Sequence, residues 1–113
     1  MSDVRTLHVY HASVQQLREI ARLTQDVRFG DLTNQLRRAA ISVVSNIAEG
    51  ANRGSNAEFV RFTGIARASN SEIEAQLDIL AALGSDVAGL QQRNASIGRQ
   101  LSGLIRYLRS PGG

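Results

Sequence analysis

Residues 35–51 read QLRRAAISVVSNIAEGA, and the spacing of their apolar side chains decides the fold class. On a helical wheel at about 100° per residue, these side chains fill a continuous arc of roughly 160° that is interrupted only by Arg37. The arc comprises Leu36, Ala40, Ile41, Val43, Val44, Ile47, Ala48 and Ala51. An ordinary bundle helix needs an arc of about 100°. The excess predicts a helix at the centre of a bundle, or one that also contacts a second subunit.

Helical spacing of apolar residues continues on both sides of this stretch. Gly30, Gly54 and Gly84 divide the chain into four predicted helices with approximate ranges 5–27, 31–53, 56–83 and 86–109. Ser55 followed three residues later by Glu58 is a capping box, which marks the start of the third helix. Because short loops join long helices, neighbouring helices are expected to be antiparallel. We therefore predict one all-α domain over residues 1–113, an antiparallel up-down four-helix bundle.

The composition excludes several kinds of site. The 113 residues contain no cysteine, which rules out disulfides and thiolate metal sites. His8 and His11 are three residues apart, but no third ligand lies near them, so we expect no metal site and no cofactor. No nucleophile is paired with a base, so we expect no enzymatic activity. Because the chain shows neither a signal peptide nor an apolar run long enough to span a membrane, we expect a cytoplasmic protein.

Charge is the most informative property for function. All thirteen basic residues are Arg, and the formal net charge is +3. After Val87 the chain carries arginines but no acid, and Arg99 and Arg106, seven residues apart, share one face of the fourth helix. Since guanidinium groups bind phosphate in paired hydrogen bonds, the candidate nucleic-acid-binding residues are Arg37, Arg93, Arg99, Arg106 and Arg109. The alternatives are an ordinary solvated face and a genome whose codons favour Arg over Lys.

Four blocks of sequence carry a family resemblance. They are QLRRAAIS at 35–42, NIAEG at 46–50, ARASNSEIEAQL at 66–77 and LSGLI at 101–105. Together they resemble the four-helix-bundle proteins first met as products of intervening sequences in bacterial 23S ribosomal RNA genes. The resemblance covers most of the chain and implies a bundle that assembles into a homopentameric ring. A related branch, the accessory variability determinant proteins of diversity-generating retroelements, is more strongly basic than this chain and binds nucleic acid.

A set of polar residues in the second and third helices matches the same family pattern. The set consists of Arg38, Asn46, Glu49, Glu72 and Gln76. We interpret it as a structural network between helices or between subunits, in which carboxylates pair with guanidinium groups and the amides satisfy the backbone. The alternative is a binding or catalytic site, which would need a pocket and further convergent groups.

The functional hypothesis follows from the arginines and the resemblance together. We expect a non-enzymatic, homo-oligomeric bundle that contacts RNA or a ribonucleoprotein through phosphates and therefore largely independently of sequence. In a ring the basic face would repeat around the axis and strengthen the field. The partners would then be other copies of the chain and RNA, with no membrane and no small-molecule substrate. The alternative is a protein–protein adaptor or scaffold with no role in nucleic-acid binding.

Overall fold

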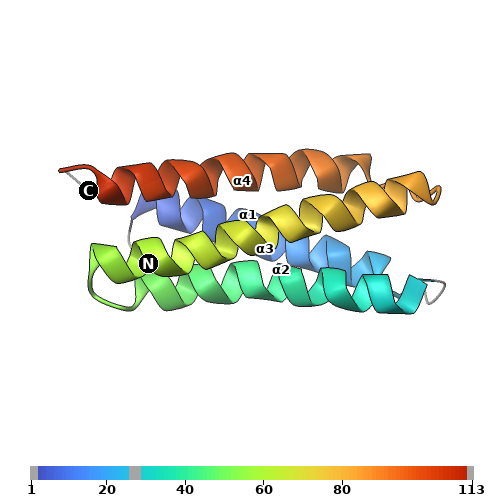
Figure 1. The fold of residues 1–113 in the computed structure, drawn as a ribbon, viewed down its shortest axis with the longest axis horizontal. Helices are drawn as coiled ribbons and strands as arrows, with labels where there is room; N and C mark the ends of the chain where they lie inside the picture. The colour runs from blue at the N-terminus through green and yellow to red at the C-terminus, as the bar shows by residue number, and fades with distance from the viewer. Residues whose placement is uncertain (1–2, 26–28, 112–113) are drawn as a thin grey trace.

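The computed structural model describes residues 3–25 and 29–111, which form four long helices and no strand. These are α1 (Val4–Leu23), α2 (Gly30–Ala51), α3 (Asn56–Ala82) and α4 (Ala88–Arg109). They lie along the long axis of a rod with extents of 47 × 20 × 18 Å (Figure 1). Each helix packs against the one before and after it, and α4 closes the bundle against α1. The predicted all-α fold of four helices is confirmed.

The helices α1 and α3 begin where a side chain accepts hydrogen bonds from their free backbone N–H groups. The Asp3 carboxylate accepts hydrogen bonds from the backbone N–H groups of Arg5, at 2.9 Å, and Thr6, at 3.3 Å. Ser55 Oγ accepts from the backbone N–H of Glu58 at 3.2 Å, so this half of the predicted capping box is present. The Glu58 carboxylate instead binds Arg61 at 3.1 Å, so the reciprocal half of the prediction was wrong.

Gly84 ends α3 in a Schellman motif. Its φ of +98° lies in the left-handed region, which glycine adopts without the steric penalty of a Cβ atom. The backbone N–H of Gly84 donates to Ala81 O at 3.0 Å, and that of Ser85 donates to Leu80 O, also at 3.0 Å. The turn between α3 and α4 therefore depends on the glycine at position 84.

Helix boundaries differ from the sequence-based ranges by two or more residues at three ends, one of which is the end of α2, at Ala51 in place of residue 53. The first helix was expected to reach Val27, but α1 ends at Leu23 with Thr24 as its cap, and residues 26–28 lie outside the described part. The Thr24 hydroxyl donates to Ala21 O at 3.0 Å, and its backbone N–H bonds back into the last turn. At the other end, α4 begins at Ala88 and not at residue 86, with the buried Val87 in the cap position.

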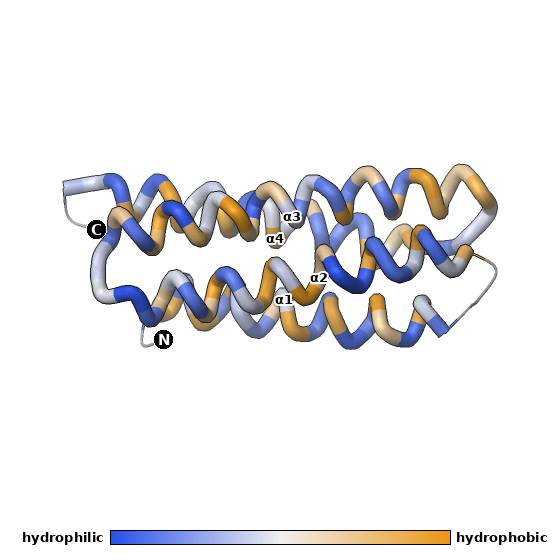
Figure 2. Tube along the Cα trace, turned by 60° about the horizontal axis from the view of Figure 1, so that its bottom comes forward, coloured by the Kyte–Doolittle hydropathy of each residue, from blue (hydrophilic) through white to orange (hydrophobic). Residues whose placement is uncertain are grey.

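Large aliphatic side chains from all four helices fill the core, and apolar residues recur along each helix (Figure 2). The most deeply buried are Val9, Ile20, Leu36, Ile47, Ile73, Leu77, Leu80, Ile97, Leu101 and Leu104. Each such side chain contributes about 1.5–3 kcal/mol through removal of its surface from water. The scarcity of aromatic residues thus matches a core of interlocking Leu, Ile, Val and Ala side chains.

The wide apolar arc of α2 is only partly used inside the chain. Val43, Leu36 and Ile47 at one end of the arc are buried, whereas Ile41 at the other end is 49% exposed. On α3, Ile65 and Ile79 are also 40% and 48% exposed. These side chains leave apolar surface on the outside of the two helices that the bundle itself does not cover.

One polar pair lies inside the contact between α3 and α4. Asn70 and Asn94 are 5% and 2% exposed. Asn70 Nδ2 donates to Asn94 Oδ1 at 2.8 Å and to Asn94 O at 3.2 Å, while Asn94 Nδ2 donates to Asn70 O at 3.0 Å. This reciprocal pairing holds two helices at one position along their axes, because a shift by one turn would leave both amides unpaired.

Candidate nucleic-acid interface

A shallow groove of about 470 Å³ runs between α3 and α4 on the outside of the bundle. Arg99 and Arg106 line it from α4, and Arg67 lines it from α3. All three arginines are exposed. Glu74 is the one acid among the lining residues, so the groove carries a net positive charge. Three guanidinium groups from two helices therefore border one channel.

Small residues keep this groove open. Ala95, Gly98 and Ser102 line it from α4, where larger side chains would fill the space between the helices. Gly98 also permits the close approach of α3: a Cβ atom at this position would lie 2.7 Å from Asn70 Oδ1. Asn70 also lines the groove, and its pairing with Asn94 fixes the relative positions of the arginines on α3 and α4.

The remaining arginines predicted from the sequence lie elsewhere. Arg93 forms an ion pair with Glu19 on α1, so its charge is neutralised on the opposite flank of α4. Arg37 lies on α2, which is not one of the two helices packed beside α4, and donates to Asn34 Oδ1 at 2.8 Å. Arg109 is exposed at the end of α4 but does not line the groove. Of the five candidates, Arg99 and Arg106 are thus the two that meet at this channel.

Sequence reasoning missed Arg67. Its position on α3 becomes informative only when the register of α3 against α4 is known, and that register depends on the buried pair of Asn70 and Asn94. Asn70 follows Arg67 by three residues, about one helical turn. A buried asparagine in each of two adjacent antiparallel helices was the signal that would have placed Arg67 beside the arginines of α4.

The predicted polar set is divided within the described residues. Asn46 Nδ2 donates to Ser42 O at 2.8 Å and to Ser42 Oγ at 3.1 Å. Ser42 Oγ in turn lies 2.8 Å from Ser69 Oγ, which links α2 to α3. Within α3 alone, Gln76 Nε2 donates to Glu72 Oε1 at 3.4 Å.

The two charged residues of α2 in this set do not pair with each other. Glu49 binds Arg53 one turn along the helix at 3.1 Å, with both side chains about half exposed. Arg38 is exposed. Within the described residues Arg38 makes no ion pair with Glu49 or Glu72, so the network between helices or between subunits stays a prediction. An exposed pair such as Glu49–Arg53 contributes only about 0.3–0.5 kcal/mol.

Two properties of the described residues bear on other kinds of site. None of their helices combines the length and apolarity needed to cross a membrane. Within residues 3–25 and 29–111, no three His, Asp or Glu side chains are grouped as ligands for a metal ion. His11 packs its ring edge-on against Tyr10, with 5.7 Å between the ring centres, and His8 faces a separate pocket between α1 and α4.

Comparisons with known proteins agree with this architecture. A family model described as 23S rRNA-intervening sequence protein matches residues 5–103. The fold is similar to the crystal structure of a protein of unknown function from the S23 ribosomal protein family of Bacteroides thetaiotaomicron, with a TM-score of 0.83 and 20% sequence identity over 91% of this chain and 99% of that one. The comparison with curated proteins gave no match. The resemblance seen in the sequence is thus confirmed, and the chain belongs to the 23S rRNA-intervening sequence protein family.

Proposed function

We propose that the protein is a non-enzymatic helical bundle that binds RNA through the groove between α3 and α4. The observation that supports this most strongly is the meeting of Arg67, Arg99 and Arg106 along one channel that contains a single acid. A chain of phosphates can lie in such a channel and contact successive guanidinium groups. Backbone contacts of this kind position an RNA but do not read its sequence.

We further propose that copies of the chain assemble through the outside of α2 and α3. Ile65 and Ile79 are fourteen residues apart, about four helical turns, so they share one face of α3, and Glu72 lies midway between them. An interface that covers these apolar side chains would also bring Glu72 against a neighbouring subunit, where an exposed cation such as Arg38 is a suitable partner. The family resemblance favours a ring of five copies, in which the arginine groove would repeat around the axis.

A protein–protein adaptor is the second candidate function. The same exposed apolar side chains on α3 favour it, because surface of this kind also suits a different protein partner. The two proposals differ in what they require of the arginine groove, which an adaptor does not need.

The RNA proposal predicts a specific change in salt dependence. Each phosphate neutralised on a single strand contributes about −0.7 to the slope of log K against log salt concentration. Replacing Arg99 and Arg106 with Gln should therefore weaken binding about equally for two unrelated RNAs and flatten the slope by about 1.4. The melting temperature should hardly change, because exposed charges contribute little to stability. Fluorescence anisotropy across a salt series measures both quantities.

A matched control removes the same charge elsewhere. Arg22→Gln with Arg37→Gln changes two exposed arginines on α1 and α2, which do not form the groove, and should leave the slope nearly unchanged. Equal effects of the two double variants would show that only net charge matters. If the unaltered protein binds neither RNA at low salt, the RNA proposal is rejected and the adaptor function replaces it.

The assembly proposal predicts the mass of the oligomer and a pair of substitutions that should dissociate it into single chains. Sedimentation equilibrium at micromolar concentration should give close to five times the chain mass of 12.2 kDa. Ile65→Glu with Ile79→Glu should give single chains with unchanged helix content, because both side chains point outward. Val4→Glu, at an exposed apolar residue of α1, is the control that should leave the assembly intact. A monomer for the unaltered chain contradicts the proposal.

A further inference from the structure

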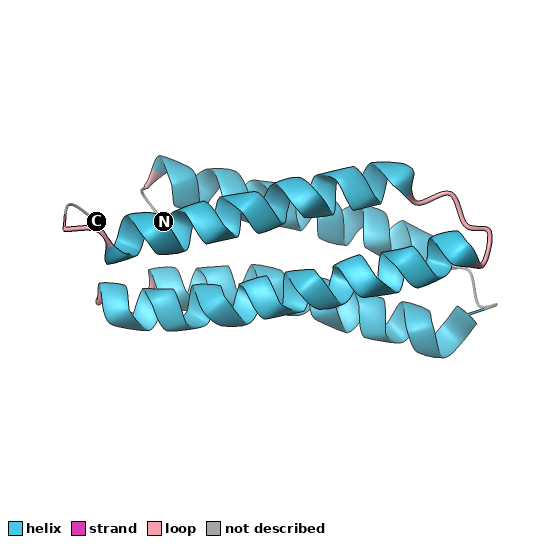
Figure 3. Cartoon of the chain, turned by 45° about the horizontal axis from the view of Figure 1, so that its top comes forward, coloured by secondary structure: helices cyan, strands magenta, loops and turns pink. Residues whose placement is uncertain are grey.

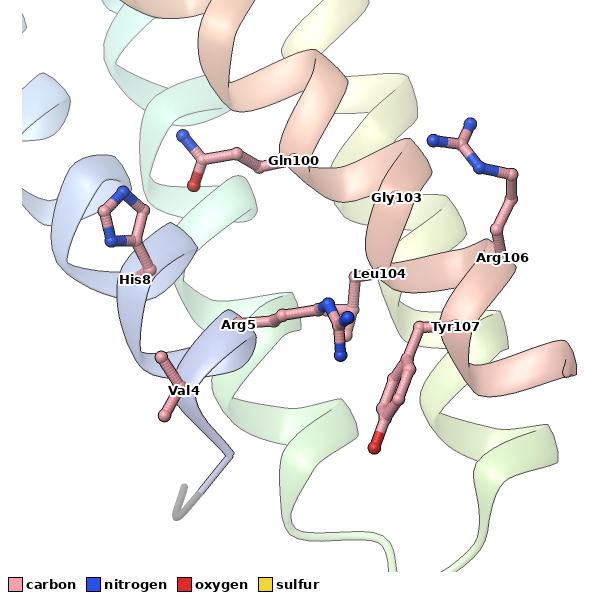
Figure 4. Close-up of a pocket in the computed structure, with 8 residues that line it drawn as sticks. All are labelled: Val4, Arg5, His8, Gln100, Gly103, Leu104, Arg106 and Tyr107. Carbon is pink, nitrogen blue, oxygen red and sulfur yellow. The ribbon is translucent and has the colours of Figure 1, made fainter. Parts of the chain in front are cut away.

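A second cavity, of about 640 Å³, opens where α1 begins and α4 ends, which is the same end of the bundle (Figures 3 and 4). Sites for small organic groups commonly measure about 300–1,000 Å³. The buried Leu104 and the half-buried Tyr107 line the cavity from α4. The volume is thus suitable for a flat ring of the size of a nucleobase.

Gly103, which lines the cavity from α4, contributes no side chain to fill it. A Cβ atom added to Gly103 would have no neighbour closer than Arg106 Nη2, at 3.8 Å. A glycine inside a helix costs stability relative to alanine. No turn and no close helix contact requires this one, and a larger side chain at this position would extend into open space.

One wall of the cavity presents a stacked pair of flat groups. The Arg5 guanidinium carbon lies 4.3 Å from the centre of the Tyr107 ring, which is a cation–π arrangement. In Figure 4, Arg5 extends from α1 toward Tyr107 on α4, on the side away from His8. Planar guanidinium and aromatic groups are the surfaces on which proteins stack unpaired bases.

The charges around the cavity favour an anionic occupant. Arg5, His8 and Arg106 are among the eight lining residues, and none of the eight is acidic. Arg106 also lines the groove between α3 and α4, and its side chain points away from Arg5 and His8. Arg106 thus borders both sites, one on each flank of α4.

We propose that this pocket receives one unstacked nucleotide of a single-stranded RNA whose phosphates follow the groove between α3 and α4. The base would lie against the pair of Arg5 and Tyr107, and Arg106 would contact the phosphate where the strand passes over α4. A base within a duplex is held in its stack and cannot enter, so the pocket selects single strands. This inference depends on the proposed RNA function and adds a preference that phosphate contacts alone do not give.

Filling the pocket tests the proposal without changing the charge. Gly103→Leu should lower the affinity for a single-stranded 10-mer about tenfold, which lies within the range that stacking of one base contributes. Its affinity for the same sequence as a blunt duplex, and the slope against salt, should stay as in the unaltered protein. Gly89→Leu is the matched control, because Gly89 also lies in α4 with open space around its Cβ position but does not line the pocket.

A second variant addresses the stacking surface itself. Tyr107→Leu should abolish the preference for the single strand, whereas Tyr10→Leu, at the other tyrosine of the chain, should retain it. Circular dichroism establishes that each variant is folded. Equal affinity of the unaltered protein for single strand and duplex, or single-strand binding by Gly103→Leu at full strength, overturns the pocket proposal and leaves the RNA function standing.

The pocket proposal also fails on either of two results with the unaltered protein. If the protein binds neither RNA at low salt, the RNA function and the pocket proposal are rejected together. If free adenosine monophosphate binds as tightly as the 10-mer, the cavity is a site for a free small ligand, and the pocket proposal alone is overturned.

Discussion

Replacing Asn94 with Ala is expected to lower the free energy of unfolding by about 2–4 kcal/mol. The Asn94 side chain is 2% exposed and takes part in two hydrogen bonds with Asn70. Its removal leaves Asn70 O without its side-chain donor, weakens the pairing of Asn70 Nδ2 and creates a cavity between α3 and α4. For a domain of this size the loss corresponds to a fall of roughly 10–20 °C in melting temperature. Urea and thermal unfolding measure it.

The control for this loss of stability is the same substitution at an asparagine on the surface. Asn34→Ala, at an exposed position of α2 where the side chain accepts from Arg37, should change stability by no more than about 0.5 kcal/mol. Replacing both Asn70 and Asn94 with Leu should recover most of the loss, because no polar group then remains buried without a partner. Equal effects of Asn94→Ala and Asn34→Ala would show that the pair does not hold α3 against α4.

The hydrophobic pattern was sufficient to predict the helices and most of the core. Leu36, Val43 and Ile47 are buried as the wheel of α2 requires, because a residue's place on a helix face depends only on its spacing along the chain. The exposed Ile41 at the edge of the same arc shows the limit of this reasoning. Periodicity gives the width of an apolar face but not how much of it a neighbouring helix within the chain will cover.

The candidate groove was harder to predict because it depends on two helices at once. Arg99 and Arg106 were identified from their spacing on one helix, but Arg67 required the register between α3 and α4. A long side chain can also reach several partners. Arg93 was predicted to bind nucleic acid, but it forms an ion pair with Glu19. Charge runs along a sequence therefore overestimate the free positive charge of a surface.

The pocket at the end of the bundle had no signal in the linear sequence. Gly103 cannot be recognised as part of a pocket from the sequence, because its effect depends on which residues of α1 lie opposite. Arg5 and Tyr107 are at nearly opposite ends of the chain, yet the antiparallel arrangement of four helices brings them together. Sites formed by the two ends of an up-down bundle require the closed tertiary structure before they can be recognised.

Replacing Gly50 with Ala is expected to destabilise the fold, by about 1–2 kcal/mol. A Cβ atom at Gly50 would lie 2.9 Å from both Phe59 Cδ1 and Phe62 Cβ. Phe62 Cβ is attached directly to the backbone of α3 and cannot turn away, so α2 and α3 would have to separate. Overpacking of this kind costs about 1–3 kcal/mol, and the better helix propensity of Ala offsets at most about 1 kcal/mol of it.

The same substitution at Gly64 should have the opposite sign. Gly64 lies in the interior of α3, and a Cβ atom there would meet nothing within 4 Å. Gly64→Ala should therefore gain about 0.5–1 kcal/mol from helix propensity alone. Urea unfolding of the two variants, analysed with a common slope, gives the difference directly. Stabilisation by both variants would contradict this prediction. It would mean that α2 and α3 are less closely packed at Gly50 than these contacts require, so that helix propensity determines the change in stability at that position.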